Sequence, residues 1–275
     1  MRFQIVTIQP EGYLHSRCFE EVSELLELSL RDLGQEALRT INRLHPQGIN
    51  VILGYHLLPD PSLLGSAPFG IYQLEHLSAL PEWLQKRSLS ILEKAQWIWD
   101  YSEANREWLR ERGLESSLVA PGYHPQMRRI EQASHRDVDL LFYGAVSPRR
   151  LKILENLIQK VPRLKILEGV YGAERDQWIA RSKMILNIHS YERPLFEAVR
   201  LSYLFNNHCA VCSEPSEGSI FEGLPSTVFD ESRLDDLTRL LQNKAELDAI
   251  QEKDGKLFET HYPMVEILHR ALDSV

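Results

Sequence analysis

The stretch Asp139-Leu-Leu-Phe-Tyr-Gly-Ala-Val-Ser-Pro-Arg-Arg150 decides the fold of the second half of the chain. Its apolar start predicts a buried strand that ends at Gly144. Ser147 is a favourable helix N-cap, and Pro148 suits the first position of a helix. A strand, a glycine turn and a helix in this order form the repeating unit of a parallel α/β sheet.

Arg149 and Arg150 follow Pro148 and therefore fall in the first turn of this predicted helix. Cations at that end oppose the helix dipole, at a cost of about 0.3–1 kcal/mol each. A diphosphate bound there would offset the cost, because it accepts backbone N–H bonds and charge-assisted bonds from arginine. The alternative is a solvent-exposed pair of arginines that binds no ligand.

Similar units flank this stretch on both sides. Downstream, the apolar pattern predicts strands at 164–167, 184–188, 209–213 and 227–229, and helices at 148–161, 174–181, 194–205, 234–241, 244–258 and 263–272. Upstream, it predicts strands at 3–8, 49–55, 69–74, 96–101 and 117–120, and helices at about 19–33, 82–94 and 102–112.

The periodicity stops between these two series, at residues 121–125 and in the polar run 128–136. We therefore expect an N-terminal domain over residues 1–125 and a C-terminal domain over residues 137–275. The predicted fold class is α/β, with two Rossmann-like domains that face each other across a cleft. Open α/β sheets bind ligands outside the carboxyl ends of their strands, so the cleft is the expected site.

Composition limits the function classes. The 275 residues are 43% hydrophobic and 25% charged, as in ordinary globular proteins. A formal net charge of −8 argues against general affinity for nucleic acid. With only 3 Cys we expect a reducing compartment, the cytoplasm. No apolar run approaches the roughly 18–20 residues of a transmembrane segment, which leaves only peripheral contact with a membrane.

A second polar cluster occurs in Leu186-Asn-Ile-His-Ser-Tyr-Glu-Arg-Pro-Leu-Phe-Glu-Ala198. A strand is predicted to end near Ile188, and Pro194 to open a helix with Glu197 in its first turn. The Glu197 carboxylate could accept hydrogen bonds from two ribose hydroxyls, and His189 could donate to a sugar hydroxyl or a phosphate oxygen. The alternatives are a glutamate that complements the helix dipole and a histidine satisfied within its loop.

Three residues of the first half are candidates for a general base. Glu75 and His76 follow a predicted strand, and His15 lies in the first turn between strand and helix. Each side chain type can have a pKa near neutrality, which suits removal of a proton from an acceptor hydroxyl. Their spacing singles out none of them, and a Glu-His pair in a surface loop is the alternative.

Other motifs predict neither a metal nor another enzyme class. Cys209 and Cys212 have a CxxC spacing, but in a predicted strand residues three apart point to opposite faces. Asp137 and Asp139 precede a strand and so fall at the wrong end of the sheet for a metal-bound donor. The sequence contains no dinucleotide-binding, P-loop, G-x-S-x-G or H-E-x-x-H motif.

The chain resembles GT-B glycosyltransferases, in particular the group 1 and CgeB-like branch. The resemblance extends over most of the chain and is carried by residues 139–150, 186–189, 193–198 and 209–214, and in the first half by 71–77, 99–105 and 119–124. It implies a transferase of polysaccharide or glycoconjugate biosynthesis that needs no metal and no cofactor. The donor substrate would be a nucleoside diphosphate sugar, bound by the C-terminal domain, and the last helix would pack back on the N-terminal domain.

By this resemblance, Glu197 matches the glutamate that contacts the donor ribose, and Gly144, Arg149 and Arg150 match the diphosphate-binding segment. The expected donor-binding residues are Tyr143, Gly144, Arg149, Arg150, His189, Arg193 and Glu197. His189 stands where the retaining group 1 pattern has the first of two glutamates. This departure leaves the stereochemical outcome open.

Two alternatives remain at this level. One is a binding or scaffold protein that keeps the GT-B shape without turnover, and the other is a sugar-nucleotide epimerase. The loops expected to face the acceptor, at His15, 56–66 and 75–80, have no pattern that selects among a sugar, a lipid, a protein and a small metabolite.

Overall fold

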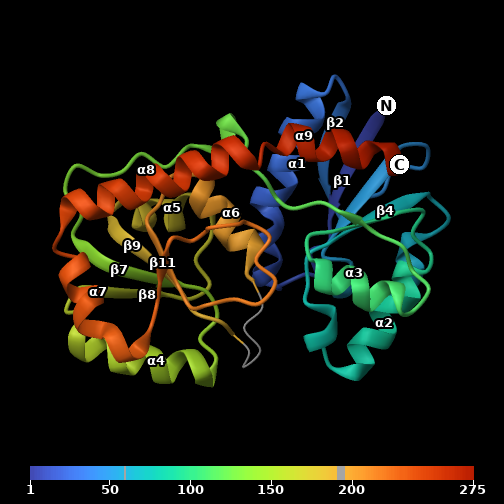
Figure 1. The fold of residues 1–275 in the computed structure, drawn as a ribbon. Coiled ribbons are helices and arrows are strands. Elements are labelled where there is room, and N and C mark those ends of the chain that lie inside the picture. Colours follow the sequence, from blue (N-terminus) through green and yellow to red (C-terminus); the bar gives the residue numbers. More distant parts are fainter. Residues whose placement is uncertain (59, 191–195) are drawn as a thin grey trace. The chain divides into compact units, whose positions relative to one another are not determined.

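The computed structural model describes residues 1–58, 60–190 and 196–275. The chain forms two compact units: unit 1 consists of Met1–His124 with Pro263–Val275, and unit 2 of Pro125–Tyr262. Each unit contains a parallel sheet covered by helices (Figure 1). Each sheet contributes to a hydrophobic core of its own.

The sheet of unit 1 has six strands among the described residues, in the order β2-β1-β3-β4-β5-β6, and neighbouring strands are parallel. They are β1 (Arg2–Thr7), β2 (Glu36–Ile41), β3 (Ile49–Leu53), β4 (Phe69–Gln73), β5 (Ile98–Asp100) and β6 (Ser117–Leu118). The order reverses at β1, which has β2 on one side and β3 on the other. Ligands of open α/β sheets bind at such a reversal.

Helices cover this sheet on both faces (Figure 1). They are α1 (Glu20–Asp32), α2 (Glu82–Leu92), α3 (Glu103–Arg110) and α9 (Met264–Ala271). Helix α9, from the far end of the sequence, packs against α1. On the other face, Ile91 of α2 and Leu109 of α3 join Val6, Ile52 and Ile71 in the core.

The sheet of unit 2 has five strands among the described residues, in the order β11-β10-β9-β7-β8, again with parallel neighbours. They are β7 (Val138–Tyr143), β8 (Leu164–Leu167), β9 (Ser182–Asn187), β10 (Val211–Ser213) and β11 (Thr227–Val228). Here the order reverses between β7 and β9. All six residues of β7 are buried, as expected of a central parallel strand.

The helices of unit 2 are α4 (Pro148–Lys160), α5 (Gly172–Ala180), α6 (Ala198–Asn206), α7 (Leu234–Leu240) and α8 (Lys244–His261). Helices α4 and α7 lie on one face of the sheet, and α5, α6 and α8 on the other (Figure 1). Phe142 of β7, Leu154 of α4 and Leu237 of α7 belong to one core cluster. The apolar periodicity of α4 therefore fixes which of its faces meets the sheet.

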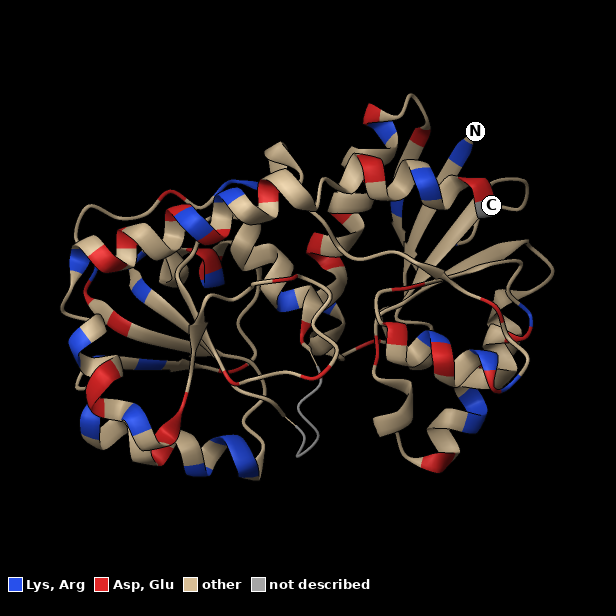
Figure 2. Ribbon diagram, in the orientation of Figure 1, with Lys and Arg blue, Asp and Glu red and all other residues tan. Residues whose placement is uncertain are grey.

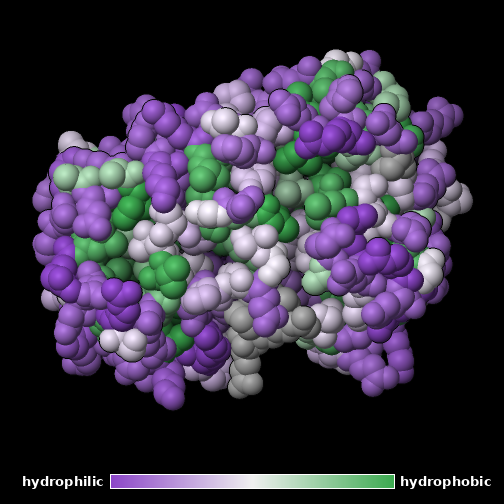
Figure 3. Space-filling model, in the orientation of Figure 1, coloured by the Kyte–Doolittle hydropathy of each residue, from purple (hydrophilic) through white to green (hydrophobic). Residues whose placement is uncertain are grey.

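Short 3-10 helices join these elements. They are η1 (Leu14–Phe19), η2 (Tyr55–Leu57), η3 (Pro61–Leu64), η4 (Leu77–Ala79), η5 (Pro125–Met127), η6 (Glu231–Arg233) and η7 (Leu272–Ser274). Basic and acidic residues are interspersed along the helices (Figure 2). On the face drawn in Figure 3, hydrophobic residues lie in small groups among hydrophilic ones. Within the described ranges, no helix is long and apolar enough to cross a membrane.

The alternation of strands and helices is confirmed, with differences at a few elements. The sequence did not predict β2, because it is an edge strand in which Ala37 alone is buried, so apolar alternation is weak. The strand predicted from Cys209 begins only at Val211. The helix predicted at 194–205 wrongly included Glu197, because α6 begins at Ala198.

Candidate functional site

The candidate site of unit 2 lies at the carboxyl ends of β7 and β9, where the strand order reverses. Strand β7 ends at Tyr143 and is followed by Gly144, and β9 ends at Asn187, two residues before His189. Because both strands are parallel neighbours, their following loops come to the same edge. The fold therefore brings together the two clusters that the sequence analysis selected separately.

Gly144 occupies a backbone conformation that other residues avoid, with φ +135°. A Cβ atom there would lie 2.5 Å from Arg200 Nη2, so a side chain would displace that arginine. Three residues further on, Ser147 Oγ accepts a hydrogen bond from the Arg150 N–H, and Pro148 is the first residue of α4. The predicted strand, glycine turn and capped helix are confirmed.

Arg150 is a buried arginine whose three guanidinium nitrogens all contact the protein. Only 3% of Arg150 is exposed to solvent. Nε donates to the Ile188 carbonyl at 2.9 Å, Nη1 to the Ala145 carbonyl at 2.9 Å, and Nη2 to Glu197 Oε1 at 2.7 Å. Arg150 thus connects the loop after β7 with the loop after β9 and with the residue that precedes α6.

Glu197 is bound by two arginines. Besides Arg150 on Oε1, Arg200 Nη1 lies 2.9 Å from Glu197 Oε2 and donates to Asn187 Oδ1 at 3.0 Å. Glu197 is the N-cap residue of α6, with φ −86° and ψ 66°, and is not inside the first turn as predicted. From this position before the helix, the carboxylate contacts Arg150 of α4 and Arg200 of α6.

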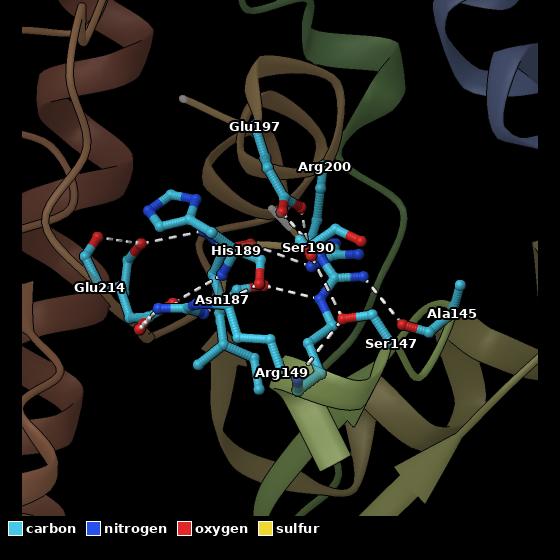
Figure 4. Close-up of polar contacts among 12 residues, drawn as sticks. Ala145, Ser147, Arg149, Asn187, His189, Ser190, Glu197, Arg200 and Glu214 are labelled. Atoms are coloured by element: carbon cyan, nitrogen blue, oxygen red, sulfur yellow. Dashed lines mark hydrogen bonds and ion pairs between the residues drawn. The ribbon is translucent and has the colours of Figure 1, made fainter. Parts of the chain in front are cut away.

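Arg149 forms a bidentate ion pair with Glu214, the residue directly after β10 (Figure 4). Arg149 Nη2 lies 2.6 Å from Glu214 Oε1, and Nη1 donates to Oε2 at 2.9 Å. The His189 backbone N–H also donates to Oε2, at 2.6 Å. Burial raises the pKa of Glu214, but these hydrogen bonds outweigh it and hold the pKa below its ordinary value.

His189 is buried, at 2% exposure. Its Nε2 lies 3.1 Å from the Pro215 carbonyl and 3.3 Å from Ser216 Oγ. Tyr143 is also buried, and its ring lies near the guanidinium groups of Arg175 and Arg200. The predicted donor residue Arg193 lies outside the described residues.

Sequence reasoning missed two residues of this cluster, Arg200 and Glu214. Arg200 follows Glu197 by three residues on α6, a spacing at which helical side chains meet, and this was an available signal. Glu214 pairs with an arginine 65 residues away, so the strand order alone makes them neighbours. The first residue after a parallel strand is a position at which polar side chains reach the ligand edge, and that rule would have included Glu214.

In unit 1, Glu75 follows β4 and meets His56, which follows β3. His56 Nε2 lies 3.6 Å from Glu75 Oε1, and the two side chains are 12% and 33% exposed. Burial raises the pKa of Glu75 to about 7. Burial, with a smaller effect of the Arg87 charge, lowers the pKa of His56 to about 4. Both side chains are therefore biased toward their neutral forms.

The two other candidates for a base have different surroundings. His76 Nδ1 lies 2.7 Å from the Tyr101 hydroxyl, and the two rings meet edge to face. His15 is exposed, and its ring lies against that of Tyr13. The fold thus shifts the pKa of Glu75 toward neutrality by burying its carboxyl group.

The acidic and cysteine motifs take part in ordinary packing. Asp139 forms ion pairs with Arg163 and Lys183, and Asp137 pairs with Arg181. Burial raises the pKa of Cys209 and of Cys212 to about 12. Over residues 1–58, 60–190 and 196–275, no group of three or more His, Cys, Asp or Glu side chains is placed to hold a metal ion.

No family model matches the chain. Among curated proteins, it is 33% identical over 104 residues to the uncharacterized protein L138 of Acanthamoeba polyphaga mimivirus. The aligned segment covers 36% of this chain and 11% of L138. It is 36% identical over 64 residues to the uncharacterized protein L140 of the same virus, which covers 23% of this chain and 21% of L140. The chain therefore spans at most about a fifth of the length of these relatives.

Solved structures share the fold at low identity. An α-glucosyltransferase in complex with UDP and a 13-mer DNA containing an HMU base aligns with a TM-score of 0.66 and 12% identity, over 100% of this chain and 99% of that one. The pneumococcal O-GlcNAc transferase GtfA, in complex with UDP and GlcNAc, aligns with a TM-score of 0.54 and 10% identity, over 90% of this chain and 58% of that one. The chain has the α/β GT-B fold, as predicted.

Proposed function

We propose that this protein is a glycosyltransferase that moves a sugar from a nucleoside diphosphate sugar to an acceptor hydroxyl. The observation that carries the proposal is the convergence of Arg149, Arg150 and Arg200 on the strand-order reversal of unit 2. A departing diphosphate gains negative charge, which fixed cations in a sheltered site stabilise. The GT-B fold, shared with enzymes solved in complex with UDP, supports the same reaction.

In this proposal the diphosphate binds to Arg149 and to the N-terminus of α4. The Arg149 side chain is 32% exposed, whereas that of Arg150 is 4% exposed and fully engaged with the protein. Arg149 is therefore the arginine that meets the ligand, and Arg150 is a positioning residue for Glu197. Gly144 leaves room for the guanidinium group of Arg200, which lies where a Cβ atom would otherwise be.

The ribose is assigned to Glu197. Each of its carboxylate oxygens receives one arginine bond, from Arg150 or from Arg200. A carboxylate has about four lone-pair sites, so each oxygen keeps an acceptor site for a ribose hydroxyl. We also propose Tyr143, His189 and Arg193 as donor-binding residues, because they belong to the two sequence clusters, residues 139–150 and 186–198, that supply Arg149 and Glu197.

The proposed reaction breaks the bond between the anomeric carbon and the diphosphate oxygen. The bonding electron pair leaves with the diphosphate, where Arg149 and the α4 N-terminus stabilise the charge. The acceptor oxygen forms the new glycosidic bond and loses its proton to a base of unit 1. Because arginines supply the positive charge, we propose that the reaction needs no metal.

Glu75 is the base that we propose. A base works best when its pKa lies near the working pH, since it must be ionised and still bind a proton. The pKa of Glu75 at about 7 meets this condition, and its side chain is 33% exposed. His76 is hydrogen bonded to Tyr101, and His15 is exposed.

Titration with UDP tests the donor site directly. We expect calorimetry to detect UDP binding to the wild-type protein, and Arg149→Ala to weaken it about 10- to 100-fold, the effect of losing charge-assisted hydrogen bonds. Arg163→Ala is the matched control, because Arg163 pairs with Asp139 at the amino end of the same sheet. If no nucleoside diphosphate binds the wild-type protein, the proposed function is wrong.

A further inference from the structure

Glu214 occupies a site built for an anion. Its carboxylate receives both Nη groups of Arg149 and the backbone N–H of His189, at 2.6 to 2.9 Å. Two parallel guanidinium bonds and a backbone N–H are also the donors that a phosphate group takes. The set lies beside the N-terminus of α4, where the helix dipole adds a further attraction for negative charge.

The ion pair of Glu214 with Arg149 is connected to β9 and to the loop that follows it. The Glu214 side chain is 13% exposed, and its backbone N–H donates to the Asn187 carbonyl at 3.0 Å. Arg149 also donates from Nη1 to the His189 carbonyl, at 3.0 Å. Glu214 is therefore connected to the end of β9 and Arg149 to the loop after it, and Glu214 is ionised at neutral pH because its hydrogen bonds lower its pKa.

The charges of the cluster determine how much electrostatic repulsion a negatively charged ligand meets at Arg149. Arg149, Arg150 and Arg200 carry three positive charges, and Glu197 and Glu214 carry two negative ones. Glu197 is paired with Arg150 and Arg200, whereas Glu214 is paired with the half-buried Arg149. A diphosphate that approached Arg149 with Glu214 still in place would lie against a second anion, which costs free energy at short range.

We propose that Glu214 is an internal counter-ion that the diphosphate of the donor displaces from Arg149, so that Glu214 sets the affinity and the charge selectivity of the site. The inference rests on the proposed function. A weakly charged ligand cannot replace the bidentate carboxylate, whereas a diphosphate offers Arg149 more negative charge. Glu214 therefore lowers the affinity for every anion and selects those with the highest charge.

The test compares Glu214→Gln with the wild-type protein in calorimetric titrations with inorganic pyrophosphate and with UDP. Glutamine has a similar size and keeps one acceptor oxygen, but it has no negative charge that competes with the ligand for Arg149. We expect Glu214→Gln to bind pyrophosphate about tenfold more tightly, the equivalent of one charge-assisted hydrogen bond. Glu217→Gln removes the same charge from an exposed position of the same loop, and we expect it to leave the affinity within about twofold.

Each outcome decides between the two proposals. Suppose that the wild-type protein binds UDP, but that Glu214→Gln binds UDP and pyrophosphate no more tightly than the wild-type protein does. The donor site then stands, and the counter-ion role of Glu214 is wrong. If Glu217→Gln raises the affinity as much as Glu214→Gln, general charge explains the gain and the specific displacement is wrong. If neither ligand binds any of these proteins, the donor site itself fails. Glu214→Ala, which also removes the charge, gives the same comparison should Glu214→Gln fold poorly.

Discussion

The two sheets share the same order of their first five strands, but the side chains at their carboxyl ends differ: one edge holds ion pairs and the other holds groups that burial makes neutral. In unit 2 the edge holds permanent charges in pairs, such as Arg149 with Glu214 and Arg150 with Glu197. In unit 1 the edge holds groups that burial makes neutral: the pKa of Glu75 is raised to about 7, and that of His56 is lowered to about 4. Burial, with a smaller effect of the Glu75 charge, also raises the pKa of the Cys18 thiol.

This difference determines which chemistry each edge can support. A charge that leaves water keeps its ionised form only if a counter-ion meets it, and otherwise its pKa shifts until the neutral form dominates. Arginines keep their positive charge at physiological pH, and the paired edge of unit 2 is therefore the one that we propose for the anion. A group whose pKa lies near neutrality, as that of Glu75 does, can take part in proton transfer. The two edges thus differ in the way that the proposed reaction requires.

The largest expected effect concerns the neutral edge. Glu75→Gln removes the proposed base, and we expect turnover to fall by about 10²- to 10⁴-fold, the usual contribution of general-base catalysis. In the wild-type protein, kcat/KM should rise with pH through about 7, as Glu75 ionises, and this rise should be lost in the variant. Steady-state kinetics across that pH range measure both.

Donor binding is the control for this variant. UDP affinity should be the same in Glu75→Gln and in the wild-type protein, because unit 2 holds the proposed donor site. His76→Ala and His15→Ala should keep the rise of kcat/KM with pH. A variant of either histidine that abolishes the rise while Glu75→Gln retains it would transfer the role of base to that histidine.

A smaller effect is expected from breaking the paired edge. Glu197→Gln removes the ribose contact and one charge between Arg150 and Arg200. We expect UDP to bind about five- to tenfold more weakly, as for one hydrogen bond to a charged group, while the affinity for inorganic pyrophosphate does not fall. Parallel titrations with the two ligands measure the contrast. Equal weakening of both would contradict the ribose assignment.

The smallest effect concerns stability. Glu75 has a pKa of about 7 in the folded protein and 4.5 as its ordinary value, so the folded state binds more protons between these values and its stability falls as pH rises through them. Glu75→Gln removes this loss. Relative to the wild-type protein, the variant should gain thermal stability between about pH 5 and about pH 8. The exposed Glu93→Gln serves as control in the same melting experiments, and an equal gain there would contradict the assignment.

Much of the fold could be predicted because its signals are local. The apolar run before Gly144, the cap at Ser147 and Pro148 at the start of α4 lie within a few residues of each other. The edge strand β2 could not be found in this way, since an edge strand buries little and shows little alternation. The helix predicted from Pro194 included Glu197, whereas Glu197 is the N-cap of α6, which begins at Ala198; Pro194 itself lies outside the described residues.

The sequence by itself determined the repeating strands and helices and the candidates Arg149, Arg150, His189 and Glu197, because polar residues after buried strands gather at one edge of a parallel sheet. Only the tertiary structure decided their partners. Arg150 meets a carboxylate 47 residues away, and Arg149 meets Glu214 across 65 residues. Periodicity and capping act over one or two turns of chain, whereas the pairing of charges depends on strand order and on which side chains reach the same point in space.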